Sequence, residues 1–248
     1  MDKRGIPLSD WMEERDRDAE ARIKASHFKA GRKPLTSNHH AYLQSIEAHA
    51  ITICTGPPGT GKTVLAAELA VRMFKEHIIK KIVITRPLVH CGGAFGFLPG
   101  NINEKVSPYL KPLTRVFKEA FGDNEFHKME LSETIVVFPL EMMRGETYAE
   151  TFAILDEAQN ATPEQLRMFL TRYGYNSKFV VNGDIRQSDL SPDSECPLVG
   201  LTSRLGGLSD VAVCKMTEDD CLRPSLIQII DQRLDDSSWL RGYSNRRR

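Results

Sequence analysis

One eight-residue segment limits the folds open to this chain more than any other feature. Residues 56–63 read GPPGTGKT, which matches the pattern GxxxxGK[ST]. An apolar run, AITICT at 50–55, precedes the segment, and a run with apolar residues at helical spacing follows it at 63–77. A strand, a glycine-rich turn and a helix in this order form a phosphate-binding loop, because backbone N–H groups turn inward and the helix N-terminus attracts anions. The segment therefore predicts an α/β fold that binds a phosphate group after its first strand.

The positions of this loop have separate expected roles. We expect the ammonium group of Lys62 to reach the β- and γ-phosphates of a nucleotide and the hydroxyl of Thr63 to bind Mg²⁺. The backbone of the whole segment is expected to surround the phosphates. The expected nucleotide-binding residues are Gly56, Pro57, Pro58, Gly59, Thr60, Gly61, Lys62 and Thr63.

A second motif supplies the carboxylates that a metal-dependent phosphate site needs. The apolar run FAIL at 152–155 ends in Asp156 and Glu157. We expect Asp156 to hold the Mg²⁺ ion together with Thr63. Side chains alternate along a strand, so Glu157 is expected to point to the other side and to polarise an attacking water. A carboxylate at this place favours hydrolysis over transfer of phosphate to a small substrate.

A third segment, VVNGDIRQ at 180–187, is an apolar run that ends in polar residues. Ligands bind at the carboxyl ends of the strands in parallel sheets, so these residues are candidates for sensing the nucleotide. Gln187 is expected to contact the γ-phosphate or the attacking water. Asp184 and Arg186 are expected to pass the state of the nucleotide to a bound strand. A simple turn at 183–184 is the alternative, and the two motifs above favour the sensor.

The order of apolar runs predicts the architecture. Strands are expected at 50–55, 81–85, 134–140, 151–157, 177–184 and 211–216, and helices at 35–49, 63–77, 113–121, 163–172 and 224–234. Alternating strands and helices favour a mostly parallel sheet with helices on both faces. We expect a charged N-terminal arm at 1–34, one domain at 35–235 and a basic tail at 236–248.

Composition excludes several classes of protein. Lys+Arg and Asp+Glu both number 33, so the formal net charge is zero. This balance argues against purely electrostatic binding of nucleic acid, although it allows a local basic channel. No apolar run approaches the ~20 residues of a membrane helix, and the N-terminal segment lacks the apolar region of a signal peptide. The 5 cysteines include no CxxC pair, which disfavours a disulfide framework or a zinc site. We therefore expect a cytoplasmic protein without a membrane partner.

Several further segments resemble one family. They are ITRP at 84–87, GFLPG at 96–100, EKVSPYLKPL at 104–113, MRGET at 143–147, LDEAQNATPEQLRMFLTR at 155–172 and NGDIRQSDL at 182–190. Together they resemble the PhoH family of P-loop ATPases across about residues 35–234. The resemblance implies a RecA-like core akin to the first motor domain of superfamily 1 helicases, with ATP and Mg²⁺ as cofactors. Members occur in bacteria and phages, which implies the cytoplasm of a bacterium or of a phage's host.

The resemblance also assigns roles to arginines. Arg223, in LRPSL, matches a family arginine expected near the γ-phosphate. Arg86, in ITRP, and Arg144, in MRGET, are candidates for a catalytic arginine or for contact with nucleic acid. Arg186 is a third candidate for such contact, because NGDIRQ resembles the helicase motif GDxxQ. Two aromatics, Phe95 and Phe97, are candidates for base stacking or, with a modest preference, for packing.

Two positions depart from the family pattern. Glu146 stands where members usually have a second arginine, which removes a positive charge from a candidate phosphate or strand contact. His39 aligns with a glutamine that reads adenine in other members. An imidazole lacks the paired donor and acceptor of an amide, so this change bears on the choice of base.

The length of the chain bears on its partners. Helicases of this superfamily close ATP between two RecA-like domains, and this chain has the length for one. We therefore expect another copy, or another protein, to complete the site. We predict a homo-oligomeric ring, with a hexamer as the expected size. The first functional hypothesis is an ATP-driven motor on RNA or single-stranded DNA. The second is an ATPase that remodels or regulates a protein partner such as a nuclease, and a small-molecule kinase is the third.

Overall fold

The protein is described by a computed structural model, which covers residues 35–88, 113–143, 145–187 and 196–224 and five positions between 226 and 233. Several expectations fall outside the described residues: the arm at 1–34, the tail at 236–248, Arg144, Phe95 and Phe97. None of the helices in the described part is long and apolar enough to cross a membrane.

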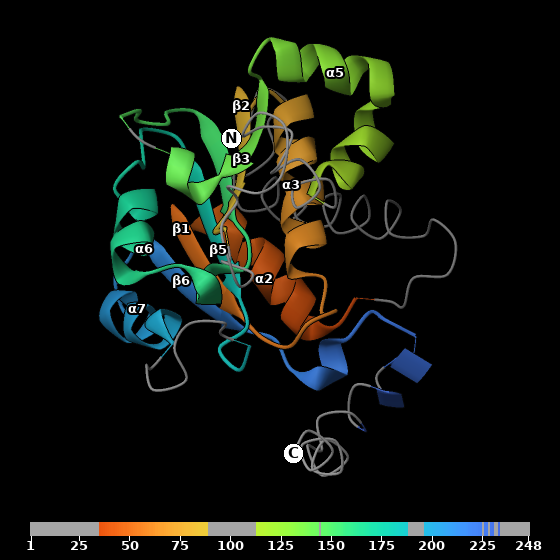
Figure 1. The fold of residues 1–248 in the computed structure, drawn as a ribbon, viewed down its shortest axis with the longest axis vertical. Helices are drawn as coiled ribbons and strands as arrows, with labels where there is room; N and C mark the ends of the chain where they lie inside the picture. Colours follow the sequence, from red (N-terminus) through yellow and green to blue (C-terminus); the bar gives the residue numbers. More distant parts are fainter. Residues whose placement is uncertain are drawn as a thin grey trace, which may run out of the picture. The chain divides into compact units, whose positions relative to one another are not determined.

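Six parallel strands form a single sheet, drawn in Figure 1. They are β1 (Ile51–Thr55), β2 (Lys81–Arg86), β3 (Ile135–Pro139), β4 (Thr151–Leu155), β5 (Lys178–Gly183) and β6 (Val211–Lys215). Their order across the sheet is β3-β2-β4-β5-β1-β6, and every neighbouring pair is parallel. The six expected strands and the α/β class are therefore confirmed.

Strand β5 lies between the strand of the phosphate loop and the strand of the acidic pair. Ile53 of β1 faces Val181 of β5, and Val180 faces Ile154 of β4. All residues of β4 are buried, as expected for a central strand covered on both faces. The carboxyl ends of β2, β4, β5 and β1 therefore meet along one edge of the sheet, where ligands bind in such folds.

Helices cover both faces of the sheet. The α-helices with defined bounds are α2 (Ser37–Ala48), α3 (Lys62–Lys75), α5 (Asp123–Leu131), α6 (Pro163–Leu170) and α7 (Pro197–Leu205), and residues 113–121 are also helical. Figure 1 places α2 and α3 on one side of the sheet and α6 and α7 on the other. On the α6 side, Leu166 and Phe169 pack with Phe179 of β5 and with Leu198 of α7 in one core cluster.

Two of these helices, α5 and α7, are absent from the sequence-based expectation. Helix α5 is mostly polar and buries only Phe126 and Met129, so it lacks the apolar stripe that marks a helix in sequence. Helix α7 begins with Pro197 and contains Gly200, which has a poor helix propensity. Its one fully buried side chain, Leu198, packs against the sheet, so tertiary contact rather than local preference accounts for this helix.

Candidate active site

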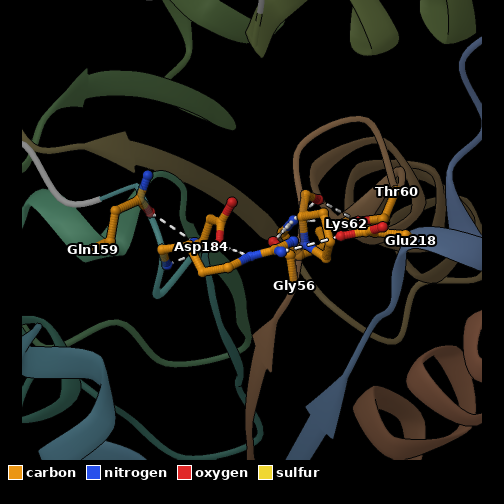
Figure 2. Close-up of polar contacts among 8 residues, drawn as sticks. Gly56, Thr60, Lys62, Gln159, Asp184 and Glu218 are labelled. Carbon is orange, nitrogen blue, oxygen red and sulfur yellow. Dashed lines mark hydrogen bonds and ion pairs between the residues drawn. The ribbon is translucent and has the colours of Figure 1, made fainter. Parts of the chain in front are cut away.

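The phosphate loop encloses the ammonium group of its own lysine. Helix α3 begins at Lys62, directly after Gly61, whose φ of 81° is in the left-handed region. The Lys62 Nζ donates to the carbonyl oxygens of Gly56 and Pro57, both at 2.8 Å, and lies 3.2 Å from the Thr60 hydroxyl oxygen (Figure 2). Burial lowers the pKa of Lys62 from its ordinary value, against the pull of nearby carboxylates. The ammonium group thus points into the loop, where phosphate oxygens would lie in a nucleotide complex.

The segment after β6 lies on the phosphate loop. The Leu222 amide donates to the Gly59 carbonyl at 2.9 Å. A Cβ placed at Gly59 would lie 2.6 Å from the Arg223 Cδ and 2.7 Å from its Nε, so the missing side chain makes room for this arginine. The structure thus brings Arg223 to the loop of its own chain, as the expectation of a nearby γ-phosphate requires.

A hydroxyl and a carboxylate lie together at the start of α3. The Thr63 Oγ1 donates a short hydrogen bond to the Asp156 Oδ1, and Asp156 is only 4% exposed. Magnesium is usually bound by one or two protein oxygens together with phosphates and waters. The pair fits that requirement, so Thr63 and Asp156 are the residues that would hold Mg²⁺. Within the described ranges, no group of three or more His, Cys, Asp or Glu residues could hold a metal ion.

Arg86, at the end of β2, contacts both members of the acidic pair. Its Nη2 donates a short hydrogen bond to the Asp156 Oδ2 and lies 3.8 Å from the Glu157 Oε1. Strand β4 ends at Leu155, so strand alternation does not set the direction of Glu157. Glu157 instead has a left-handed backbone with a φ of 52°, and both carboxylates flank the same guanidinium. The expected opposite orientation of the two side chains stays a prediction.

Gln159 joins the acidic pair to the carboxyl end of β5. Its Nε2 donates to the Glu157 Oε2 at 2.7 Å, and its Oε1 accepts from the Asp184 amide at 3.0 Å. Gln159 is 2% exposed. Sequence reasoning missed this residue. The available signal was its position two residues after Glu157 in LDEAQN, but nothing in the sequence places it beside Asp184.

The turn after β5 continues this chain of contacts. The Asp184 Oδ1 accepts from the Arg186 amide at 3.0 Å, and the Arg186 Nη1 lies 3.1 Å from the Glu218 Oε1. Figure 2 shows the contacts from Gln159 through Asp184 toward Glu218. Arg186 and Gln187 are exposed. The expected contact of Gln187 with a γ-phosphate and that of Arg186 with a nucleic acid stay predictions.

His39 lies beneath the phosphate loop. The residue is 0% exposed, and its Nε2 is 2.9 Å from the Thr60 carbonyl oxygen. A carbonyl only accepts, so the Nε2 carries the proton. Burial lowers the pKa of His39 below its ordinary value of 6.5, although hydrogen bonds to the backbone of Thr60 and Asp220 oppose this. The ring thus supports the loop backbone, and its expected reading of the base stays a prediction.

The other departure from the family pattern lies at the opposite edge of the sheet. Glu146 is 3.4 Å from the Nζ of Lys81, the first residue of β2, whereas Arg86 at the site is the last residue of that strand. Glu146 therefore pairs with a lysine at the amino end of β2, and its charge is not part of the candidate active site.

The buried His39 predicts a dependence of stability on pH. In the unfolded chain the His39 imidazole takes up a proton near pH 6.5. In the folded protein its pKa is lower, so it takes up the proton only at a lower pH. Between these two values the unfolded state holds more protons, so the free energy of unfolding should decrease as the pH falls through 6.5. Urea denaturation from about pH 7.5 to about pH 5.5 measures this decrease. His39→Gln should reduce it, whereas the same change at the exposed His127 should not. An equal slope for both variants contradicts the assignment.

The fold and the site together define a class of protein. The phosphate loop follows β1, the acidic pair follows β4, and β5 lies between these two strands in the parallel sheet. This arrangement is that of a RecA-like P-loop domain. A profile of the PhoH-like protein family matches residues 32–235. The chain therefore belongs to the PhoH-like protein family.

Known relatives agree with this assignment. The chain is 40% identical to a PhoH-like protein of Synechocystis over 82% of its own length and 62% of the relative's. It is 38% identical to a PhoH-like protein of Bacillus subtilis over 81% of its length and 63% of the relative's. It is 36% identical to protein PhoH of Escherichia coli K12 over 75% of its length and 53% of the relative's. The chain thus spans somewhat more than half of the length of these relatives.

A solved structure shares the fold at low sequence identity. The large terminase of a thermophilic bacteriophage, in complex with ADP, matches with a TM-score of 0.53 and 14% identity, over 81% of this chain and 50% of that one. At this identity the match supports the RecA-like fold alone.

Proposed function

We propose that this chain hydrolyses ATP to ADP and phosphate with Mg²⁺ bound. The observation that carries the proposal is the pairing of Thr63 with Asp156 at the start of α3, with Glu157 directly beside it. Nucleotide binding in the related terminase fold and the PhoH-like family membership support the same conclusion.

The residues of the site divide the reaction between them. Mg²⁺ would supply charge compensation for the phosphates when it is held by Thr63 and Asp156. Lys62 would leave its loop carbonyls and bind phosphate oxygens. Glu157 would accept a proton as the oxygen of a water bonds to the γ-phosphorus. The bond from that phosphorus to the bridging oxygen then breaks, and ADP leaves.

We further propose that hydrolysis is coupled to RNA or single-stranded DNA, in a ring of identical copies. The support is the exposed segment 185–187, which carries Arg186 at the carboxyl edge of the sheet. Because Arg223 lies on the loop of its own chain, a ring would have to supply a different arginine across its interface. Sedimentation at micromolar concentration, with and without ATP, tests the ring, and a monomer with full ATPase activity contradicts it.

A second candidate function is the remodelling or regulation of a protein partner. The observation that favours it is the position of Arg86, which pairs with the acidic residues of the site and is not free to contact a strand. A net charge of zero is consistent with this alternative.

Steady-state ATPase activity with and without single-stranded RNA and DNA separates the two candidates. We expect stimulation by one polymer at low salt and less stimulation at moderate salt, because phosphate contacts weaken as salt rises. Arg186→Gln should reduce the stimulation. Arg167→Gln, on α6, is the matched control. Robust activity that ignores both polymers favours the protein partner, and no activity at all contradicts ATP hydrolysis.

A further inference from the structure

The amide of Gln159 uses both of its ends, and each end holds a different part of the site. The Nε2 donates to the carboxylate of Glu157, and the Oε1 accepts from the backbone of Asp184 (Figure 2). An amide has one donor end and one acceptor end, so these two partners together fix which way the group faces. Rotation of the amide would break both contacts.

Packing against β5 holds Gln159 in this position. A Cβ at Gly183 would lie 2.9 Å from the Gln159 Oε1 and 3.1 Å from its backbone nitrogen, so the side chain runs directly over the β5 backbone. With 2% of the residue exposed, water has little access to replace either hydrogen bond. A buried polar group that loses its partner destabilises the folded protein, and this cost keeps the amide in place.

We propose that Gln159 is a positioning residue that aims the carboxylate of Glu157 and ties its direction to the turn after β5. The inference rests on the proposed ATP hydrolysis. Glu157 itself is half exposed and its backbone is in the left-handed region, so its side chain needs an external partner to hold one direction. Arg86 is 3.8 Å away and has its short hydrogen bond to Asp156, which leaves Gln159 as the closer partner of Glu157.

The contact with Asp184 connects Gln159 to the exposed side chain of Arg186. A phosphate group of a bound strand would compete with Glu218 for Arg186, and both of these side chains are exposed. An exposed ion pair contributes little to stability, so a phosphate group can displace Glu218 from Arg186. A shift of the turn would then move the Asp184 amide and, through Gln159, the carboxylate of Glu157.

Two substitutions separate positioning from simple packing. Gln159→Glu keeps an oxygen that accepts from the Asp184 amide, but it replaces the donor to Glu157 by a second carboxylate. Gln159→Leu removes both contacts. We expect both variants to lower kcat for ATP by about 10²-fold, because small errors in placing a catalytic group have effects of this size. Nucleotide affinity, measured with a fluorescent ADP analogue, should stay within about 3-fold, because neither variant touches the phosphate loop.

Gln165→Glu is the matched control. Gln165 also donates its Nε2 to a glutamate, Glu141 at 3.0 Å, but that pair lies at the start of α6. This variant should keep the kcat of the wild-type protein. If the wild-type protein hydrolyses ATP and Gln159→Glu keeps its kcat, the positioning role is wrong and the proposed function stands. If nucleotide affinity falls together with kcat, Gln159 supports binding and the inference is also overturned. If the wild-type protein hydrolyses no ATP, the proposed function fails first.

Discussion

Glu157→Gln is expected to lower kcat for ATP hydrolysis by about 10³-fold, because an amide cannot accept the proton of the attacking water. Nucleotide affinity should be retained, since the contacts of Lys62 and Thr63 do not involve this residue. Lys62→Ala should abolish both ATP hydrolysis and nucleotide binding, because it removes the cation that the loop encloses. Steady-state kinetics and binding of a fluorescent nucleotide measure the two effects separately.

The same change at Glu164 is the control for Glu157→Gln. Glu164 lies in the first turn of α6 and is exposed, so its amide variant should hydrolyse ATP as the wild-type protein does. Normal hydrolysis by Glu157→Gln would show that another group accepts the proton, and the catalytic assignment would be wrong.

Gly59→Ala is expected to reduce nucleotide affinity and kcat together, by about 10²-fold in kcat/KM. The new Cβ would lie 2.6 Å from the Arg223 Cδ, a separation that real Cβ atoms essentially never show, so the arginine side chain has to shift from its place on the loop. The φ of +79° at Gly59 adds backbone strain of about 1–2 kcal/mol for a residue with a side chain.

Gly122→Ala separates these two causes. Gly122 has almost the same φ, +80°, but a Cβ there meets nothing within 4 Å. Both variants should therefore lose stability through backbone strain in urea denaturation, while only Gly59→Ala loses ATPase activity. A variant of Gly59 with normal kinetics would place Arg223 outside the site.

Much of the site follows from local sequence, and the rest depends on which strands become neighbours. The phosphate loop and the acidic pair are each read from a few consecutive residues. Arg86 reaches Asp156 only because β2 pairs with β4, where Thr85 faces Leu155. No local sequence pattern predicts that pairing. Gln159 meets Asp184 for the same reason, since β4 and β5 are adjacent. Local motifs thus identify the chemical groups, and the strand order decides which of them touch.

The direction of Glu157 marks a limit of the periodicity argument. Alternation describes side chains within a strand, and β4 ends two residues before Glu157. Beyond that end, the left-handed backbone and the contact with Gln159 set the direction. In α7, likewise, the core contacts of Leu198 outweigh Gly200, which disfavours a helix in isolation.

The strand order also has a consequence for folding during synthesis. Strand β1 pairs with β5 and β6, so Ile51 finds its neighbours Phe179 and Val211 far along the chain. A ribosome releases the phosphate loop long before it releases either of these strands, and contacts so distant in sequence form slowly. A nascent chain that stops short of Lys215 would carry every residue of the GPPGTGKT segment but would lack a complete β6, one of the two strands that flank β1. We therefore expect nucleotide to protect the newly synthesised chain from proteolysis only once β6 has emerged.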